Sequence, residues 1–577
     1  MKNIFLLLPV CFLLACHHET AVNKVLFKAD LDTVYNNASG THTIPLDSEK
    51  IHDLTNLGML WGFIKYYHAS VNQGNFNMDA ELFRVLPKVL AARNPTEANT
   101  VMGQWVDHFG VPGICKNCKE VKKTAATKLM PDYGYLFDTG NFPLSLIRKL
   151  AFIRDNRDTS QAHYYVGVER YARNPVFTHE VAYNDAYPDA GVRLLALYRY
   201  WNMIQYFFPD RHLIGEDWNK VLPEFIPSFC NAKDTLAYQL ACLKLIARIH
   251  DTHAQLYGDY ALQKMRGSYY TPFKAAFVEG KLVVTGYYAD STAGIMNQVD
   301  PGDVIEQIDG VPVDSLVKKY LQLTPASNYS TQLQSMSASN GWLLRGQVPD
   351  IHLLIRRNGF VISADVQRSN NNPDYNAPFN RPFIMDGNIG YIYPASLQDN
   401  DIDSLKTRFK DTKGIILDMR CYPGTFMPYT YGAWFKMLSS PFVISSKPSV
   451  TMPGWFGLTD TFRNGQVGFT HYTGKLVIIV NGQTLSQAEF TTMALSTVHG
   501  AVVIGDTTAG ADGNVSAVNL PGGLASQISG LGEIYPDGTE SQRAGVKIDH
   551  FIAPTIAGIR ARRDEQLEYA IKLINGK

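Results

Sequence analysis

One segment near the C-terminus places a buried strand, a polar turn and a helix in direct succession. Residues 476–480 form an apolar run without polar alternation, which is typical of a strand buried on both faces of a parallel sheet. Helical spacing of apolar residues begins at Phe490, so Ser486 lies where the strand gives way to the helix. Unpaired amides and the helix dipole can stabilise a negatively charged oxygen there. Ser486 followed by Glu489 is also typical of a capping box, so a purely structural role stays open.

Further apolar runs at 389–393, 414–419 and 501–505 alternate with helical patterns, which predicts an α/β core with parallel strands. A chain of 577 residues exceeds one hydrophobic core, so several domains are expected. We expect a signal peptide over 1–15, a tether over 16–49, a helical or mixed domain over 50–190, a helical domain over 191–270, a small β-rich domain over 271–369 and an α/β core over 377–577.

The N-terminal half contains an internal duplication. Residues 54–87 and 194–223 align, with Trp61 matching Trp201 in an aromatic-rich stretch. Apolar residues recur at steps of three and four in both copies, which predicts amphipathic helices whose aromatic stripe packs into a core.

The N-terminus carries an export signal. An apolar run over 4–15, too short to span a membrane, follows a positive residue and ends at Ala15 directly before Cys16. This pattern resembles a bacterial lipoprotein signal, which implies lipidation of Cys16 and a protein anchored to a bacterial membrane in the cell envelope, facing the periplasm or the surface. A simple secretory signal with an incidental cysteine is the alternative, and both imply export.

Charge and cysteine content exclude several classes of function. Lys plus Arg and Asp plus Glu are equal at 53 each, and no basic block occurs, which disfavours a nucleic-acid partner. Cys115 and Cys118 form a lone C-x-x-C, for which a local disulfide or coincidence is favoured over a metal or redox site. We therefore expect no metal and no cofactor.

A serine nucleophile needs a base to take its proton. Among the histidines, His253 stands out because it closes a His-Asp-Thr-His cluster at the end of a predicted helix. A histidine near a helix end is also commonly a satisfied polar residue, so this assignment depends on its neighbours in space.

Several motifs occur in a recognisable order. They are Asp251-x-His253, then Gly302-Asp303-Val304-Ile305, then Asp418-x-Arg420 followed by Pro423-Gly424, then Thr484-x-Ser486-x-x-Glu489, and then Gly505-Asp506-x-Thr508-x-Gly510. Over 190–577 this order resembles the tail-specific or C-terminal processing serine peptidases, most closely their tricorn-core branch. The resemblance implies a ClpP/crotonase-like α/β peptidase core, a helical N-terminal region and a PDZ-like domain over 271–369, which would bind an extended peptide by strand addition.

The resemblance also implies roles for single residues. Ser486 matches the nucleophile, the amide of Gln487 matches one oxyanion donor, and Gly424 matches the second. The processing branch uses a lysine base shortly after the Thr-x-Gly motif, but residues 511–513 read Ala-Asp-Gly. The tricorn branch instead uses a histidine preceded by a hydroxyl residue, which Thr252 and His253 resemble.

The fourth member of the tricorn network, a glutamate, falls on Gln542. A glutamine can orient an imidazole but cannot balance its charge, so either Gln542 only positions His253 or Glu540 takes the role.

These patterns predict an exported, lipid-anchored serine endopeptidase that cleaves peptides or unfolded proteins through an acyl-enzyme. The substrate would add along a strand edge near residues 521–523, with the PDZ-like domain presenting or gating it. The alternative is a catalytically silent relative that binds peptides or apolar ligands, because fold does not fix function. A third hypothesis makes the N-terminal half a docking module for glycans or partners. A homo-oligomer stays open.

Overall fold

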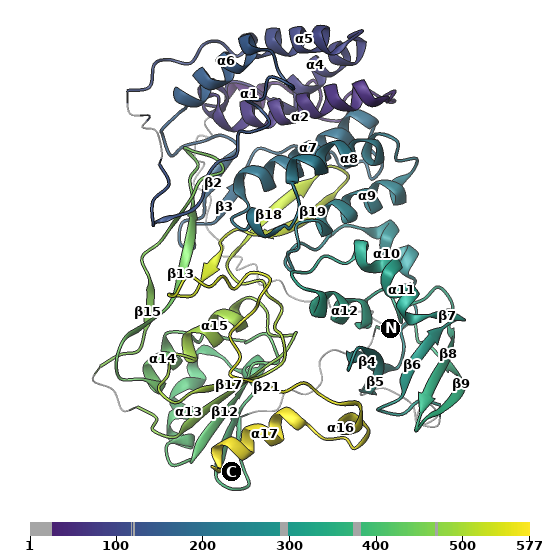
Figure 1. Ribbon diagram of the computed structural model, residues 1–577, viewed down its shortest axis with the longest axis vertical. Helices are drawn as coiled ribbons and strands as arrows, with labels where there is room; N and C mark the ends of the chain where they lie inside the picture. The colour runs from purple at the N-terminus through teal and green to yellow at the C-terminus, as the bar shows by residue number, and fades with distance from the viewer. Residues whose placement is uncertain are drawn as a thin grey trace, which may run out of the picture.

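The chain folds into a helical region, a small antiparallel sheet unit and an α/β core (Figure 1). The structure is a computed structural model that describes residues 26–116, 118, 122–288, 298–372, 382–467 and 471–576. The predicted signal peptide and Cys16 lie outside the described residues. Within these ranges, no helix has both the length and the apolar character needed to cross a membrane.

The helical region, residues 28–266, lies at the top of Figure 1. Its helices are α1 (Lys28–Leu31), α2 (Ser48–Tyr67), α3 (Ala69–Asn72), α4 (Met78–Ala91), α5 (Pro95–His108), α6 (Leu144–Asp155), α7 (Ala190–Phe207), α8 (Trp218–Cys230), α9 (Thr235–Ala247) and α10 (Tyr260–Arg266). Its short strands are β1 (Thr127–Leu129), β2 (Val166–Val168) and β3 (Pro175–Phe177). Residues of both ranges that we expected as separate domains, 50–190 and 191–270, contribute to one hydrophobic core.

The predicted duplication is visible as a repeated contact. The indole nitrogen of Trp61 in α2 donates to the carbonyl of Met78, the first residue of α4, at 2.7 Å. The indole nitrogen of Trp201 in α7 donates to the carbonyl of Trp218, the first residue of α8, at 2.9 Å. Both pairs are 17 residues apart, so the two copies build the same helix–turn–helix unit.

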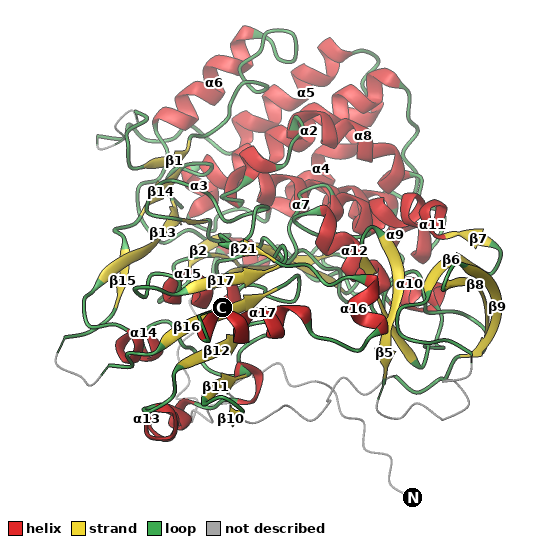
Figure 2. Cartoon of the chain, turned by 60° about the horizontal axis from the view of Figure 1, so that its bottom comes forward, coloured by secondary structure: helices red, strands yellow, loops and turns green. Residues whose placement is uncertain are grey.

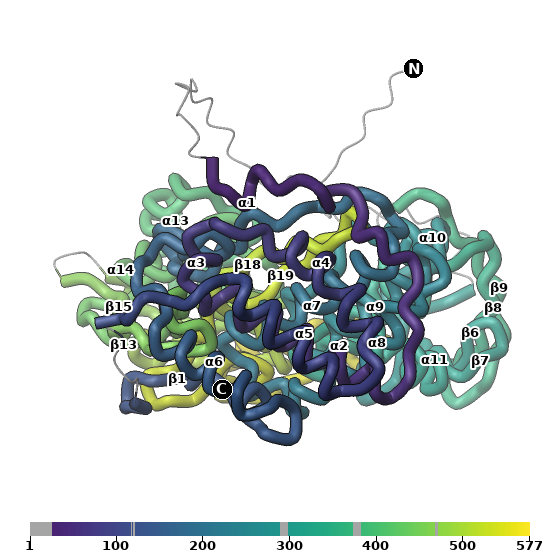
Figure 3. Tube along the Cα trace, turned by 90° about the horizontal axis from the view of Figure 1, so that it is seen from above, coloured from purple at the N-terminus to yellow at the C-terminus, as the bar shows by residue number. Residues whose placement is uncertain are grey.

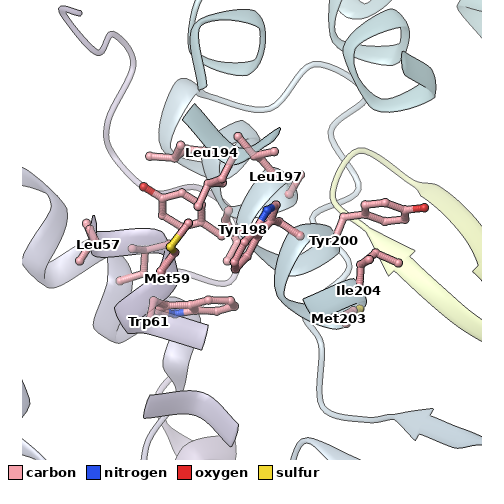
Figure 4. Packing of buried hydrophobic residues seen from close by; sticks show 14 of the residues in the cluster. Leu57, Met59, Trp61, Leu194, Leu197, Tyr198, Tyr200, Met203 and Ile204 are labelled. Carbon is pink, nitrogen blue, oxygen red and sulfur yellow. The ribbon is translucent and has the colours of Figure 1, made fainter. Parts of the chain in front are cut away.

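The helices α2 and α7 of the two copies pack closely against each other. A Cβ atom on Gly58 would lie 2.5 Å from the Tyr198 ring, and one on Gly62 would lie 1.8 Å from the Asn202 side chain. Any larger residue at these two positions would separate the helices. Figure 4 shows Trp61 and Tyr198 between them, with ring centroids 6.4 Å apart.

A buried cluster of four charges joins the copies. Lys65 lies 2.6 Å from Glu180, and Arg199 contacts both Glu180, at 2.9 Å, and Asp79. No side chain in the cluster exposes more than 4% of its surface. Two cations and two anions balance, which makes such burial tolerable.

The small sheet unit spans residues 273–367. It contains β4 (Phe273–Val278), β5 (Lys281–Tyr287), β6 (Val304–Ile308), β7 (Val311–Pro312), β8 (Asp350–Arg357), β9 (Phe360–Gln367), α11 (Val313–Tyr320) and α12 (Tyr329–Ser337). The strands pair in the antiparallel order β4-β5-β6-β8-β9, and β7 pairs with β6. The PDZ-like assignment of this unit stays a prediction.

The α/β core spans residues 383–576 and contains the predicted parallel sheet (Figure 2). Its strands are β10 (Phe383–Met385), β11 (Ile389–Ile392), β12 (Gly414–Asp418), β16 (Lys475–Val480), β17 (Val502–Gly505) and β21 (His550–Phe551). Its helices are α13 (Ile402–Phe409), α14 (Thr430–Phe435), α15 (Gln487–Leu495), α16 (Ile556–Arg560) and α17 (Glu565–Ile574). The order is β10-β11-β12-β16-β17-β21, parallel throughout except for the antiparallel edge strand β10. The expected multidomain α/β fold is confirmed.

Both faces of this sheet are covered, which explains the uninterrupted apolar run of β16. Leu476, Ile478 and Val480 point into a cluster that includes residues of α15. Val477 and Ile479 point into a second cluster on the opposite face, where α17 packs. Alternation therefore sends every β16 side chain after the first into a core.

The remaining strands connect the core to the helical region. The strands β13 (Ser440–Pro448), β14 (Phe456–Leu458), β15 (Phe462–Asn464) and β20 (Glu533–Ile534) form a second sheet with β1. The strands β18 (Val515–Leu520) and β19 (Leu524–Ser529) form a hairpin that lies under the helices in both Figure 1 and Figure 3. Four hairpin side chains, those of Val518, Leu520, Leu524 and Ile528, belong to the hydrophobic core of the helical region.

Candidate active site

Ser486 lies between β16 and α15, in a strained conformation. Its φ is 56° and its ψ is −119°, a region that residues other than glycine rarely occupy. The turn is fixed on both sides, because the Thr484 hydroxyl donates to the Met419 carbonyl at 2.7 Å and the Ser486 amide donates to the Ala511 carbonyl at 3.0 Å. Ser486 and Glu489 also form the capping box that their spacing predicts. The capping box explains the Ser486–Glu489 pairing, whereas the positive φ of Ser486 has no part in a capping box and favours a functional role.

Glu489 ties the start of α15 to the loop that follows β17. Its buried carboxylate accepts from the Thr508 hydroxyl at 2.5 Å and from the amides of Gly510 and Ala511 at 2.9 and 3.0 Å. It also accepts from the Ser486 amide at 3.4 Å. Burial raises the pKa of Glu489, and these hydrogen bonds oppose the rise. The residue holds the 508–511 loop beside the nucleophile position.

His253 follows α9 and is held from the Nδ1 side of its ring. Nδ1 lies 2.9 Å from the Ser529 hydroxyl at the end of β19 and 3.6 Å from the Asp251 carboxylate. The side chain of His253 is only 8% exposed. Nε2 is buried and has no hydrogen-bond partner among the described residues. The nitrogen that a general base would use is therefore unoccupied.

The segments of Ser486 and His253 meet at the 508–511 loop. The hydroxyl of Thr252 donates to the carbonyl of Ala509 at 3.0 Å, two residues before the carbonyl that binds the Ser486 amide. The small sheet unit reaches the same loop, because the Asn328 side chain donates to the Thr508 carbonyl at 2.9 Å. Since Nε2 has no partner, the two segments are brought together without a direct hydrogen bond between His253 and Ser486.

The two predicted oxyanion donors differ in availability. Gln487 is the first residue of α15, where backbone amides have no partner within the helix. The amide of Gly424, in contrast, donates to the Pro394 carbonyl at 3.0 Å. A Cβ atom at Gly424 would lie 2.5 Å from the Leu397 carbonyl oxygen, so this glycine permits close packing on the 394–397 turn. The assignment of Gly424 as second donor is wrong for this arrangement, since its N–H is already used.

Neither Gln542 nor Glu540 orients His253, so both predictions are corrected. Glu540 pairs with Lys128 at 2.9 Å and with His212 at 2.8 Å. Burial alone would raise the pKa of Glu540, but these two partners lower it to about 2. The buried side-chain amide of Gln542 has no hydrogen-bond partner in the described part of the chain. The side chain that contacts Nδ1 of His253 is that of Ser529.

The segment at 521–523 is also not an open substrate edge. The Tyr238 hydroxyl donates to the Pro521 carbonyl at 2.7 Å, and the Gly522 amide donates to the Tyr183 carbonyl at 2.7 Å. Pro521 and Gly522 are buried against the helical region. The hairpin turn is used for packing because its two strands insert under α7.

Sequence reasoning missed two residues near the nucleophile. Burial raises the pKa of Tyr422, and hydrogen bonding with the Ser486 side chain lowers it in part, so the phenol lies beside the hydroxyl. Asp512 is buried, and burial followed by the charges of Glu533 and Glu489 raises its pKa well above the usual range. Both lie inside or next to motifs, but no local pattern indicated where their side chains point.

The Asp-x-Arg motif anchors the loop that carries Tyr422. Arg420 binds Asp418 at 2.9 and 2.7 Å and Asp564 at 3.0 and 2.8 Å. The motif therefore fixes the end of β12 to the start of α17. Among the described residues, no group of three His, Cys, Asp or Glu side chains could hold a metal ion.

A strained serine at a strand-to-helix turn, and a histidine whose Nε2 has no partner among the described residues, both lie in segments that contact the 508–511 loop. This combination is typical of the serine hydrolase class. Residues 388–552 match the model of Peptidase family S41. The match lies within the α/β core, and the protein is a serine peptidase.

Several solved structures are similar to the chain at low sequence identity. Mature CPAF is 13% identical, with 67% of this chain and 98% of that chain covered at a TM-score of 0.51. The photosystem II D1 C-terminal processing protease is 17% identical, with coverage of 63% and 92% and a TM-score of 0.37. The tricorn protease is 14% identical, with coverage of 70% and 38% and a TM-score of 0.34. No curated protein sequence matches the chain.

Proposed function

We propose that the protein is an exported, lipid-anchored serine endopeptidase that cleaves peptide bonds in peptides or unfolded proteins, with Ser486 as nucleophile and His253 as base. The conformation of Ser486 carries the proposal. A residue other than glycine is held at a positive φ, and its turn is fixed from both sides. Strain of this kind persists where the surrounding structure imposes it, and it clusters at active sites.

In the proposed acylation, Nε2 of His253 accepts the proton of the Ser486 hydroxyl while the oxygen bonds to the carbonyl carbon of the scissile peptide. The carbonyl electron pair moves to its oxygen, beside the amide of Gln487 and the positive end of α15. When the carbonyl re-forms, the carbon–nitrogen bond breaks, and the imidazolium gives its proton to the leaving amine. The acyl group remains on Ser486.

In the proposed deacylation, a water molecule replaces the amine. Nε2 of His253 takes one proton of the water as its oxygen attacks the acyl carbon. The bond to Ser486 then breaks, the imidazolium returns the proton to the serine oxygen, and a carboxylic acid leaves.

The reaction requires Nε2 to reach the Ser486 hydroxyl in the substrate complex. Catalytic hydrogen bonds are commonly long or absent without substrate and tighten when it binds. The 508–511 loop is the element that can couple the two groups, because it contacts Thr252 on one side and the Ser486 amide on the other.

The cysteines support export to an oxidising compartment. Cys115 and Cys118 form a disulfide, whereas Cys230, Cys242 and Cys421 are free and buried. Disulfides persist in secreted and periplasmic proteins and are rare in the cytosol. This agrees with an exported chain that is lipidated at Cys16.

A fluorophosphonate probe tests the nucleophile and the base. We expect the purified protein to be labelled at Ser486, located by peptide mass spectrometry, and labelling to be lost in Ser486→Ala and strongly slowed in His253→Ala. Ser496→Ala is the matched control, because Ser496 lies at the other end of the same helix and donates to the Met493 carbonyl. Labelling of a different serine, with Ser486 unmodified, would overturn the assignment.

The unpartnered Nε2 also favours the second candidate, a silent relative that binds peptides without cleaving them. That function predicts a folded protein that no probe labels and that still binds an unfolded peptide. The labelling experiment therefore separates the two candidates.

A further inference from the structure

Asp251 is a buried negative charge with an unusual set of neighbours. Its side chain is fully buried. Among the described residues, its only ion-pair neighbour is His253, at 3.6 Å, and no Lys or Arg contacts it. A buried carboxylate is costly unless hydrogen bonds or an opposite charge compensate it. Asp251 therefore depends on hydrogen-bond donors and on the histidine.

Three donors converge on this carboxylate. The Ser529 amide donates at 2.6 Å, the Ser529 hydroxyl at 3.0 Å and the His253 amide at 3.1 Å. Burial alone would raise the pKa of Asp251, but His253 and these hydrogen bonds lower it below its usual value. The group is therefore ionised at neutral pH.

The number of protons in the hydrogen-bonded series Asp251–Ser529–His253 fixes the tautomer of His253. A hydroxyl has one proton, and that of Ser529 is directed at the Asp251 carboxylate. The Ser529 oxygen can then only accept from Nδ1, which lies 2.9 Å away. Nδ1 must carry the ring proton, so the lone pair of the neutral imidazole is on Nε2. That nitrogen is the one without a partner.

We propose that Asp251, acting through the Ser529 hydroxyl, is the positioning residue of His253 and takes the role that was expected of Gln542. This inference rests on the proposed function, because it assumes that His253 is the base. When Nε2 takes the Ser486 proton, the ring becomes a cation, and the fixed charge of Asp251 stabilises it without itself being protonated. The carboxylate that the sequence lacked at position 542 is thus supplied from position 251.

The contact of Asp251 and His253 with Ser529 also connects the helical region to the α/β core. Asp251 and His253 belong to the helical region, whereas Ser529 ends the hairpin that the α/β core inserts under α7. The core therefore sets the orientation of the imidazole that is to act on its own serine.

One other titratable group faces Asp251. The hydroxyl of the buried Tyr200 of α7 has no hydrogen-bond partner within the described ranges, and burial followed by the charge of Asp251 raises its pKa. Figure 4 shows its ring pointing away from the contact with α2, toward the strand drawn in yellow. Tyr200 stays neutral at neutral pH, so it adds no charge that could replace Asp251.

A purely structural role for Asp251 makes a different prediction. Its bond to the His253 amide closes a turn, and losing that turn would lower stability without changing the pH profile. Asp251→Asn keeps the shape but removes the charge. Its amide would donate to the Ser529 oxygen, which would turn the Ser529 hydroxyl toward Nδ1 and place the ring proton on Nε2, the wrong tautomer for a base.

The test measures the rate constant of fluorophosphonate labelling at Ser486 against pH, together with the melting temperature. We expect Asp251→Asn and Ser529→Ala to slow labelling at least about tenfold, a part of the roughly 10²–10⁴-fold that a general base contributes. Asp251→Asn should also change the pH profile of labelling, because the cationic ring loses its anion. Ser516→Ala removes a buried hydroxyl of the same hairpin, which donates to the Pro175 carbonyl, and should leave rate and profile unchanged.

The outcomes separate this inference from the proposed function. Failure of the wild-type protein to label at Ser486 would overturn both. Labelling that requires His253 but proceeds at the wild-type rate and pH profile in Asp251→Asn and Ser529→Ala would overturn the inference alone. If Asp251→Asn does not fold, Ser529→Ala decides, since it removes only the hydroxyl link.

Discussion

Replacing Glu489 by glutamine tests whether the 508–511 loop positions the nucleophile. One carboxylate oxygen accepts from the Thr508 hydroxyl and the Gly510 amide, and the other accepts from the amides of Ala511 and Ser486. A glutamine has one oxygen and one NH₂ group, so whichever way it turns, two donors would face a third donor. The shape of the side chain is retained, but half of its hydrogen bonds are lost.

The expected size follows from the burial of these groups. Each buried donor that loses its acceptor costs about 1–3 kcal/mol, so Glu489→Gln should destabilise the core by roughly 2–6 kcal/mol. If the 508–511 loop shifts to relieve the unpaired donors, the cost appears instead as a higher activation barrier of the reaction at Ser486. Each 1.36 kcal/mol added to that barrier is about a tenfold loss of rate. Calorimetry and the rate of fluorophosphonate labelling at Ser486 measure the two parts.

Glu533→Gln is the matched control. Glu533 is buried in the same core, and burial, opposed by Ser445 and Lys128, leaves its pKa raised to about 7. Its carboxyl accepts one side-chain hydrogen bond, from Ser445 at 2.5 Å, which an amide oxygen can also accept. If the Glu489→Gln protein has the melting temperature of the wild type and is labelled at the wild-type rate, the positioning role of Glu489 is refuted.

Three further predictions concern stability and location. Arg199→Met should cost about 3–5 kcal/mol because it leaves buried carboxylates unbalanced. Arg248→Met removes two partly exposed pairs, with Glu216 and Glu224, and should cost less than about 1 kcal/mol for each; equal melting temperatures of the two variants would contradict this. The pKa of Glu533 is raised to about 7 in the folded protein, so the contribution of this carboxyl group to the free energy of unfolding is present at low pH and is lost as pH rises from about 4.5 to 7. The melting temperature of the wild type should therefore fall across this window more steeply than that of Glu533→Gln. Cys16→Ser should move the protein from the detergent phase to the aqueous phase in a cloud-point partition; an unchanged distribution would exclude lipidation at this residue.

The sequence predicted those features that are encoded locally. The apolar run at 476–480 predicted a doubly covered parallel strand, and Ser486 was placed at the turn after it, because strand and helix periodicities change within a few residues. The duplication was also visible, since Trp61 and Trp201 occupy matching places in matching helices.

The partners of His253 could not be predicted in the same way. Ser529 is 276 residues away from it, in a strand whose residues carry no catalytic pattern. Gln542 was assigned by its distance from a motif along the chain, but a side chain in that segment points where the local turn directs it. Asp251 was inside the recognised motif, yet its role depends on a hydroxyl that only the folded hairpin supplies.

The inserted hairpin has a consequence for how this protein can be divided. Cutting the chain to the family-matched segment 388–552 would strip the covering from Val518, Leu520, Leu524 and Ile528, which are at most 3% exposed in the whole protein. Burial of each large aliphatic side chain contributes about 1.5–3 kcal/mol, so the fragment would lose roughly 6–12 kcal/mol of folding free energy. It would also expose a contiguous apolar patch to water. Expression of the isolated domain should therefore yield aggregates, and any minimal active unit must begin upstream of the helix that leads to the histidine.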